Sequence, residues 1–271
     1  MTASDAEAKA AVAAMFDRSA ATYEDLGAAY FGPMGRALVS RAAITRGSRV
    51  LDVGCGRGAV LFPAAEATGP SGSVVGIDLA PGMVERTAAA AAHLPWVTVA
   101  LGDAAEPDFP DGSFDVVLAG LVLFFLPSPE TALANYRRLL RPGGKLVFST
   151  FAAQDPLLSA VVRALTPLVP PEAAERPVDR FKDTSSISAF LGDWDAVAYS
   201  GQPIETSFTG KDHLWTWFWS HGMRAFLEAV PADRLEEAEA IAYRVMDAAA
   251  GPDGRITLHT TVRITTAICR D

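Results

Sequence analysis

Short apolar runs bounded by turn-forming residues alternate with helical patterns through the first part of the chain. Continuous apolar runs of this length are typical of strands buried on both faces, as in a parallel sheet. The predicted strands are residues 48–53, 73–78, 97–101, 114–119 and 145–151, and the predicted helices are residues 58–68, 82–92 and 129–140. Right-handed crossovers would wind such elements into a doubly wound, mostly parallel α/β sheet.

The pattern changes after residue 151. A proline-containing loop and helix region at 152–192 precedes an extended segment at 196–208. An aromatic helical region at 212–229 and an amphipathic helix at 233–250 follow. Residues 255–269 are rich in β-branched side chains, which predicts one long strand.

The composition of the chain excludes several classes of protein function. The 271 residues are 50% hydrophobic and carry a formal net charge of -9, which argues against a general nucleic-acid binder. No apolar run is long enough to span a membrane, and we expect no signal peptide. We interpret Cys55 and Cys269 as free thiols of a cytoplasmic protein. The four histidines lack metal-ligand spacing, so we assign no metal.

A glycine-rich loop follows the first strand, in the sequence Val-Leu-Asp-Val-Gly-Cys-Gly-Arg-Gly-Ala at residues 50–59. Glycine allows a sharp turn and close approach of the backbone to a ligand. Gly54, Gly56 and Ala59 fit the dinucleotide fingerprint G-x-G-x-x-G/A. However, Asp52 lies just before the loop, where a carboxylate would repel a pyrophosphate.

The same loop resembles motif I of the class I S-adenosylmethionine (SAM)-dependent methyltransferases. Further matches follow in order at residues 101–104, 114–121 and 133–146, and residues 15–23 resemble the N-terminal F-D-x-x-A-x-x-Y helix of the ubiquinone/menaquinone-biosynthesis-like, small-molecule branch. The resemblance implies a seven-stranded Rossmann-like fold whose last strand inserts antiparallel. It also implies a helical N-terminal lid at 1–44, a SAM-binding core at 45–151, and an acceptor-pocket insertion (152–192 and 209–250) with closing strands within 152–271.

The resemblance also implies roles for cofactor-binding residues. Asp52 would lie near the SAM ammonium, Asp78 would bind the ribose hydroxyls, and Asp103 would accept a hydrogen bond from the exocyclic amine of adenine. As plainer alternatives, Asp78 could cap a helix and Met83 could be a core residue. The full predicted cofactor site is Tyr23, Asp52, Gly54, Cys55, Gly56, Asp78, Leu79, Met83, Gly102, Asp103, Ala104, Ala119 and Leu121.

An aromatic segment at residues 213–222 is the candidate acceptor site, because large flat side chains beside two histidines suit a planar or polyketide-like molecule. We predict His221 as the general base, with His213 as the second choice, although each tryptophan could equally be core. The predicted acceptor-binding residues are Phe16, Tyr30, Phe31, Phe125, Trp217, His221 and Arg224.

The sequence therefore predicts a SAM-dependent methyltransferase that modifies O, C or N of a small, largely apolar metabolite. Phe124 and Phe125 replace histidines of many relatives, which weakens the case for a base there. One alternative is a SAM-binding cyclase or rearrangement enzyme on the same fold. A second is an NAD(P)-dependent oxidoreductase. We expect a small-molecule partner and no nucleic acid, and a homodimer is one assembly that the sequence leaves open.

Overall fold

The computed structural model describes residues 3–171 and 180–270, and the remaining residues of the predicted 152–192 region lie outside it. Seven strands form one sheet in the order β3-β2-β1-β4-β5-β7-β6. The strands are β1 (Arg49–Val53), β2 (Ser73–Asp78), β3 (Val97–Leu101), β4 (Phe114–Gly120), β5 (Leu140–Ala153), β6 (Trp194–Phe208) and β7 (Ile256–Cys269).

The first five strands pair in parallel, whereas β7 runs antiparallel between β5 and β6. The predicted doubly wound sheet with an inserted antiparallel strand is confirmed. β5 begins earlier than predicted, because Leu140 already pairs with Phe114 before the register shifts at the glycine pair.

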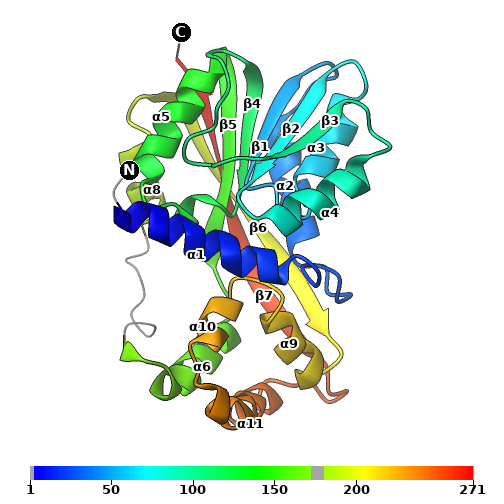
Figure 1. The fold of residues 1–271 in the computed structure, drawn as a ribbon, viewed down its shortest axis with the longest axis vertical. Helices are drawn as coiled ribbons and strands as arrows, with labels where there is room; N and C mark the ends of the chain where they lie inside the picture. Colours follow the sequence, from blue (N-terminus) through cyan, green and yellow to red (C-terminus); the bar gives the residue numbers. More distant parts are fainter. Residues whose placement is uncertain (1–2, 172–179, 271) are drawn as a thin grey trace.

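Helices cover both faces of the sheet (Figure 1). Two neighbouring residues of β5 show how the two faces of the sheet are buried. Val147 belongs to the buried cluster that includes α2 (Phe31–Ala42) and α3 (Leu61–Thr68). Phe148 belongs to the cluster on the opposite face, which includes α5 (Pro129–Leu139) and α8 (Thr184–Phe190). Alternate burial on two faces explains why the parallel strands are continuous apolar runs. α4 (Pro81–Ala91) lies beside β2 and β3.

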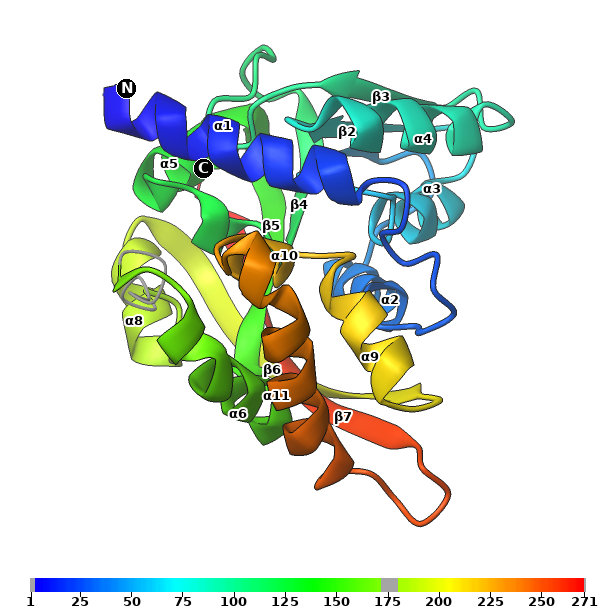
Figure 2. The ribbon, with the colours of Figure 1, turned by 60° about the horizontal axis from the view of Figure 1, so that its bottom comes forward.

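A second group of helices lies below α1 (Ala3–Ser19) in Figures 1 and 2 and shares a buried cluster with β6 and β7. It contains α6 (Pro156–Leu165), α9 (Lys211–Phe218), α10 (Arg224–Glu228) and α11 (Leu235–Asp247). The short 3-10 turn η2 (Thr166–Leu168) directly follows α6, and η3 (Ala232–Arg234) directly precedes α11, whereas η1 (Leu123–Phe125) follows β4. None of the helices in the described ranges has the length and apolar character needed to cross a bilayer.

Two segments that the sequence predicts as helical are interrupted in the structure. The aromatic segment at 212–229 is not one helix, because the chain turns after Trp219 and restarts at Arg224. Gly222 lies in this turn, and a Cβ there would lie 3.5 Å from the Phe125 ring. The helix-like motif at residues 15–23 is helical only as far as Ser19, where α1 ends; the following turn brings the ring centroids of Phe16 and Tyr23 to 6.2 Å.

Candidate active site

A cavity of about 470 Å³ opens at the carboxyl ends of the central strands. In open α/β sheets this is where ligands bind, since the loops of neighbouring strands diverge there. The cavity is bounded by the glycine loop after β1, by α1, by η1 and by the turn between α9 and α10. It therefore joins the predicted cofactor loop to the predicted acceptor segment.

The glycine loop takes its shape from left-handed backbone positions. Gly54 has φ 64°, and a Cβ there would lie 2.0 Å from Val122, so only glycine fits. Gly56 has φ 48°, and its Cβ position has open space around it. The Gly56 N–H donates to Asp78 Oδ2 at 2.8 Å, which ties the loop to the end of β2. The loop is thus fixed while its backbone stays open to a ligand.

Two carboxylates line the cavity. Asp52 is 1% exposed, and neither of its oxygens has a hydrogen-bond partner among the described residues. Burial raises the pKa of Asp52 well above its usual range. Burial also raises the pKa of Asp78, against the opposing effect of hydrogen bonds from the backbone of Ala80 and Gly56. Unpaired buried carboxylates are costly, so Asp52 is suited to a cationic ligand group.

Asp103 lies just outside the cavity lining. Its Oδ2 accepts from Lys9 Nζ of α1 at 2.6 Å, and its Oδ1 accepts from the Ala105 N–H. Ala104 does line the cavity, and its carbonyl accepts from the buried Tyr136 hydroxyl at 2.7 Å. The predicted residues Gly102 and Ala119 are not among the lining residues. Ala119 is fully buried within β4, and a Cβ at Gly102 would meet Ile77.

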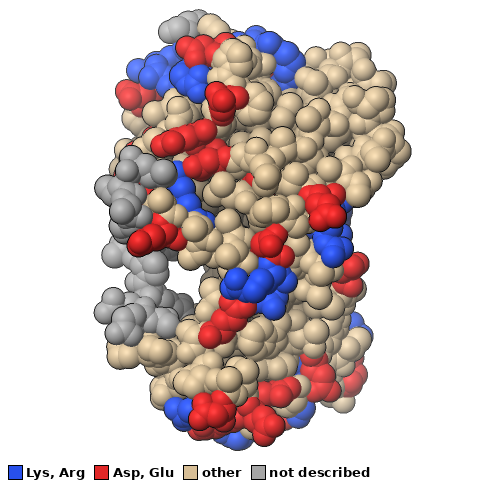
Figure 3. All heavy atoms as spheres, in the orientation of Figure 1, with Lys and Arg blue, Asp and Glu red and all other residues tan. Residues whose placement is uncertain are grey.

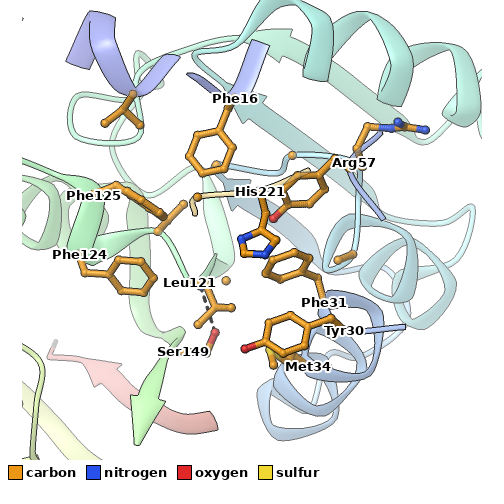
Figure 4. Close-up of a pocket in the computed structure, with 18 of the residues that line it drawn as sticks. Phe16, Tyr30, Phe31, Met34, Arg57, Leu121, Phe124, Phe125, Ser149 and His221 are labelled. Carbon is orange, nitrogen blue, oxygen red and sulfur yellow. Dashed lines mark hydrogen bonds between the residues drawn. The ribbon is translucent and has the colours of Figure 1, made fainter. Parts of the chain in front are cut away.

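Leu121 adopts a strained backbone at the cavity wall. Its φ is 56°, unusual for a residue with a side chain, and its N–H donates to Ser149 Oγ at 3.1 Å (Figure 4). Such strain persists where surrounding structure imposes it, and it is concentrated at functional sites. Ser149 ends the pairing of β4 with β5, so both strands shape this wall.

Aromatic side chains surround the other end of the cavity (Figure 4). Tyr23 stacks on Phe31 with ring centroids 4.8 Å apart, and Phe16 meets Phe125 edge-on at 5.2 Å. Tyr30 contacts the cavity from the start of α2. These rings come from the N-terminal segment and from η1, two parts of the chain that the sequence pattern alone does not bring together.

His221 lies between these rings, in the turn after α9. Burial lowers its pKa to about 3, so the imidazole is neutral around pH 7. Its ring centroid is 3.9 Å from that of Trp217, which is 1% exposed. The low pKa is unfavourable for a general base, which works best with a pKa near the working pH. The predicted base role of His221 stays untested.

His213 and Arg224 do not line the cavity. The His213 Nε2 donates to the Leu26 carbonyl at 2.8 Å, so this ring holds the loop before α2. Arg224 bonds Glu228 and the carbonyls of Arg18 and Trp219. Their predicted roles in the reaction have no support in this geometry, because both side chains are used in packing the insertion against the N-terminal segment.

Several lining residues were missed by the sequence interpretation. Arg57 stands in the glycine loop itself, where its Nη1 donates to the Ala20 carbonyl at 2.6 Å. Its position between the loop glycines Gly56 and Gly58 was the sequence signal that could have identified Arg57 as a site residue. The other missed residues include Lys9, Met34, Phe124, Ser149 and Met223, which reach the cavity only through tertiary packing.

Comparisons with known proteins place this geometry in a family. A family model described as "Methyltransferase domain" matches residues 51–148. Nocamycin O-methyltransferase of Saccharothrix syringae is 38% identical over 264 residues, which cover 88% of this chain and 92% of that protein. The chain belongs to the class I SAM-dependent methyltransferases. The predicted family, enzyme class and cofactor are thereby confirmed.

Further comparisons agree with this family. Aklanonic acid methyltransferase DauC of Streptomyces sp. (strain C5) is 39% identical over 188 residues, covering 69% of this chain and 86% of that protein. The crystal structure of the Bacillus YcgJ protein shares the fold, with a TM-score of 0.57, 20% identity, and coverage of 88% of this chain and 99% of that one. This methyltransferase therefore uses S-adenosyl-L-methionine and acts on small molecules.

The residues at the cavity fit that cofactor. SAM carries an ammonium group and two ribose hydroxyls, all of which are hydrogen-bond donors. The cavity offers them Asp52, whose oxygens have no partner, and Asp78 at the end of β2. The open backbone at Gly56 leaves room for the cofactor beside the loop.

Proposed function

We propose that this methyltransferase methylates an oxygen atom of a small, largely apolar metabolite of polyketide-like character. The observation that carries the proposal is the single cavity that joins the two carboxylates to a wall of aromatic side chains. The relatives support it, since one is named for O-methylation of nocamycin and another for aklanonic acid.

In this proposal Asp52 holds the ammonium of SAM, Asp78 holds the ribose, and Leu79 and Met83 pack against the adenine. Bound SAM supplies an electrophilic methyl group. The protein contributes alignment and the exclusion of water, since methyl transfer to an oxygen is an in-line displacement. Phe16, Phe31 and Phe125 would cover the acceptor.

We further propose that residues 152–192 and 209–250 form the acceptor side of the site. Leu158 and Val162 of α6 and Met223 and Phe226 near α10 support this assignment, because all four line the cavity. The N-terminal segment at 1–44 would then form the lid, and residues 45–151 the cofactor core.

We infer that the enzyme works in the cytoplasm without nucleic acid, and the homodimer stays a prediction. Two free cysteines support the location. On the face drawn in Figure 3 acidic and basic side chains are interspersed, with no broad basic surface of the kind that phosphates require. Light scattering would determine the oligomeric state.

Calorimetry with S-adenosylhomocysteine and with NAD, followed by mass spectrometry of acceptors incubated with SAM, tests the proposal. We expect S-adenosylhomocysteine to bind, NAD not to bind, and a product heavier by one methylene unit. Conversion of an acceptor to an isomer without added mass would instead favour the cyclase alternative. Binding of NAD alone would overturn the proposal.

A further inference from the structure

Two residues that line the cavity at its acceptor end each have a ring nitrogen with no hydrogen-bond partner among the described residues. These nitrogens are Trp217 Nε1 and His221 Nε2, both buried. Their rings are 3.9 Å apart between centroids, and both residues line the cavity. A buried polar nitrogen without a partner costs free energy, so two at one place call for an explanation. A ligand atom that bonds both would supply it.

The hydrogen-bonding pattern of His221 fixes which of its nitrogens carries a hydrogen. The Met223 N–H donates to Nδ1 at 3.3 Å, within the turn that leads into α10. A neutral imidazole has one N–H and one bare nitrogen. Since Nδ1 accepts, the hydrogen is on Nε2. Trp217 Nε1 is a donor in any state, so both unpaired nitrogens are donors.

The surroundings of His221 keep it neutral. Its ring neighbours are Trp217, Phe31 and Phe218, with centroids at 3.9, 6.0 and 6.5 Å. Burial among these rings is the cause of its lowered pKa, about 3. A group whose pKa lies far below the working pH is a poor proton acceptor at neutral pH. It remains a good hydrogen-bond donor.

We propose that Trp217 and His221 form a pair of neutral N–H donors that hold the acceptor oxygen, and that this oxygen arrives already ionised. The substrate class is therefore an oxygen acid, such as a carboxylic acid or a strongly acidic enol, attached to a flat apolar skeleton. This inference rests on the proposed O-methylation and names its acceptor group.

The reaction balances without a base. A lone pair of the oxygen anion forms the new C–O bond as the S–C bond breaks, and that bonding pair stays on sulfur. One anion and one sulfonium cation give a neutral ester or enol ether and a neutral thioether. No proton leaves the acceptor during transfer, so His221 has none to accept. The two N–H donors position the oxygen.

Nitrogen-15 NMR of histidine-labelled protein tests the state of His221, with His221→Gln used to assign its signals. We expect protonated Nε2 and bare Nδ1 from pH 5 to pH 8. An imidazolium, or a hydrogen on Nδ1, at pH 7 would overturn the inference. This readout requires no methyl transfer, so it can fail while the proposed function stands.

Calorimetry with S-adenosylhomocysteine-saturated enzyme tests the oxygen site, with 2-naphthoate, 2-naphthol and naphthalene as probes of one shape. We expect 2-naphthoate to bind tightest. Trp217→Phe should weaken its binding about tenfold, since hydrogen bonds to charged groups contribute about 1.5–3 kcal/mol. Equal binding of the three probes would contradict the inference. Loss of S-adenosylhomocysteine binding by the wild type would instead count against the proposed function.

Two substitutions separate a donor from a base. His221→Gln keeps an N–H donor without a basic nitrogen, whereas His221→Phe removes both. We expect 2-naphthoate to bind His221→Gln at least fivefold more tightly than His221→Phe, on the basis of about 1 kcal/mol for a retained hydrogen bond. Equal loss in both variants, together with a methylation rate that rises between pH 5 and pH 8, would show that His221 is a base.

Discussion

At the scale of single residues, Asp52 combines opposite effects on stability and on binding. Its folded-state pKa is raised by burial, so ionisation is harder in the folded protein than in the unfolded chain. The stability that the protonated form provides is present at low pH. This contribution to stability is lost as the pH rises from the pKa of Asp52 in the unfolded chain through its pKa in the folded protein. At neutral pH this carboxylate therefore destabilises the cofactor-free enzyme.

We predict that Asp52→Asn stabilises the cofactor-free enzyme at pH 7 by about 1–3 kcal/mol, while SAM binds about 10- to 100-fold more weakly. The enzyme is stabilised because the substitution removes an unpartnered buried charge, and SAM binds more weakly because it removes the partner of the SAM ammonium. Thermal unfolding between pH 4 and pH 8, with and without SAM, measures both.

The matched control is Asp111→Asn, because Asp111 pairs with Arg138 at the surface and its side chain is 76% exposed. It should change both quantities little, since exposed ion pairs contribute at most about 1 kcal/mol. Unchanged SAM affinity in Asp52→Asn would remove this residue from the cofactor site.

The carboxylates at strand ends could be predicted from the sequence, because a parallel sheet places all carboxyl ends at one edge. Asp52 and Asp78 needed only that rule and the glycine loop. The motif at residues 15–23 implied an N-terminal lid, but nothing in the sequence around Lys9 indicates that this side chain reaches the site and pairs with Asp103. Gly102 and Ala119 were assigned by motif position, and neither lines the cavity.

At the scale of elements, α1 lies across the cavity and is tied to both sides of it. Lys9 pairs with Asp103, and Asp17 Oδ1 accepts from the Gly82 N–H at 2.6 Å, on the core side. On the insertion side, Arg18 Nε donates to Glu228 Oε1 at 3.0 Å. The helix therefore connects the core to α10 on the insertion side of the cavity.

We predict that Glu228→Gln leaves the free energy of unfolding within about 1 kcal/mol of wild type, because the Arg18–Glu228 pair is largely exposed. Amide hydrogen exchange in α1 should nevertheless become severalfold faster, because the contact to α10 is weakened. Mass-spectrometric hydrogen exchange of residues 3–19 measures this.

Glu237→Gln is the control, because it breaks an equivalent pair with Arg234 that lies within one stretch of chain and does not involve α1. Exchange in α1 should be unaffected by it. Equal exchange in wild type and Glu228→Gln would mean that the core contacts alone hold α1.

Element positions followed the sequence closely wherever a local rule decides them. Apolar runs predicted all five parallel strands, and the β-branched stretch predicted β7. Pro63 did not break α3, because it lies in the first turn, where its missing N–H has no helical partner. The break between α9 and α10 has no marked local signal; Gly222 in this turn lies beside Phe125, 97 positions earlier in the chain, a neighbour that no local pattern contains.

At the scale of the whole molecule, one continuous sheet joins the cofactor side to the acceptor side. β5, β7 and β6 carry residues of both buried clusters, so the insertion helices pack on strands of the core sheet. We therefore expect the described parts of the chain to unfold as one cooperative unit.

We predict that Phe148→Ala, which empties a fully buried position on β5, lowers the free energy of unfolding by about 3–5 kcal/mol. Urea unfolding followed by circular dichroism and by tryptophan fluorescence should give coincident midpoints, both shifted downward. Thr98→Ala, on the exposed surface of β3, should have little effect. Separate midpoints would show that the insertion unfolds independently.

The position of β7 has a consequence for how the protein is made. This strand is translated after every other strand of the sheet, yet it lies between β5 and β6 rather than at the edge. On the ribosome, β5 has an open edge and β6 has no neighbour until residues 256–269 emerge. Exposed strand edges are templates for wrong pairing, so we expect newly made chains to be most prone to mispairing in the interval before β7 emerges.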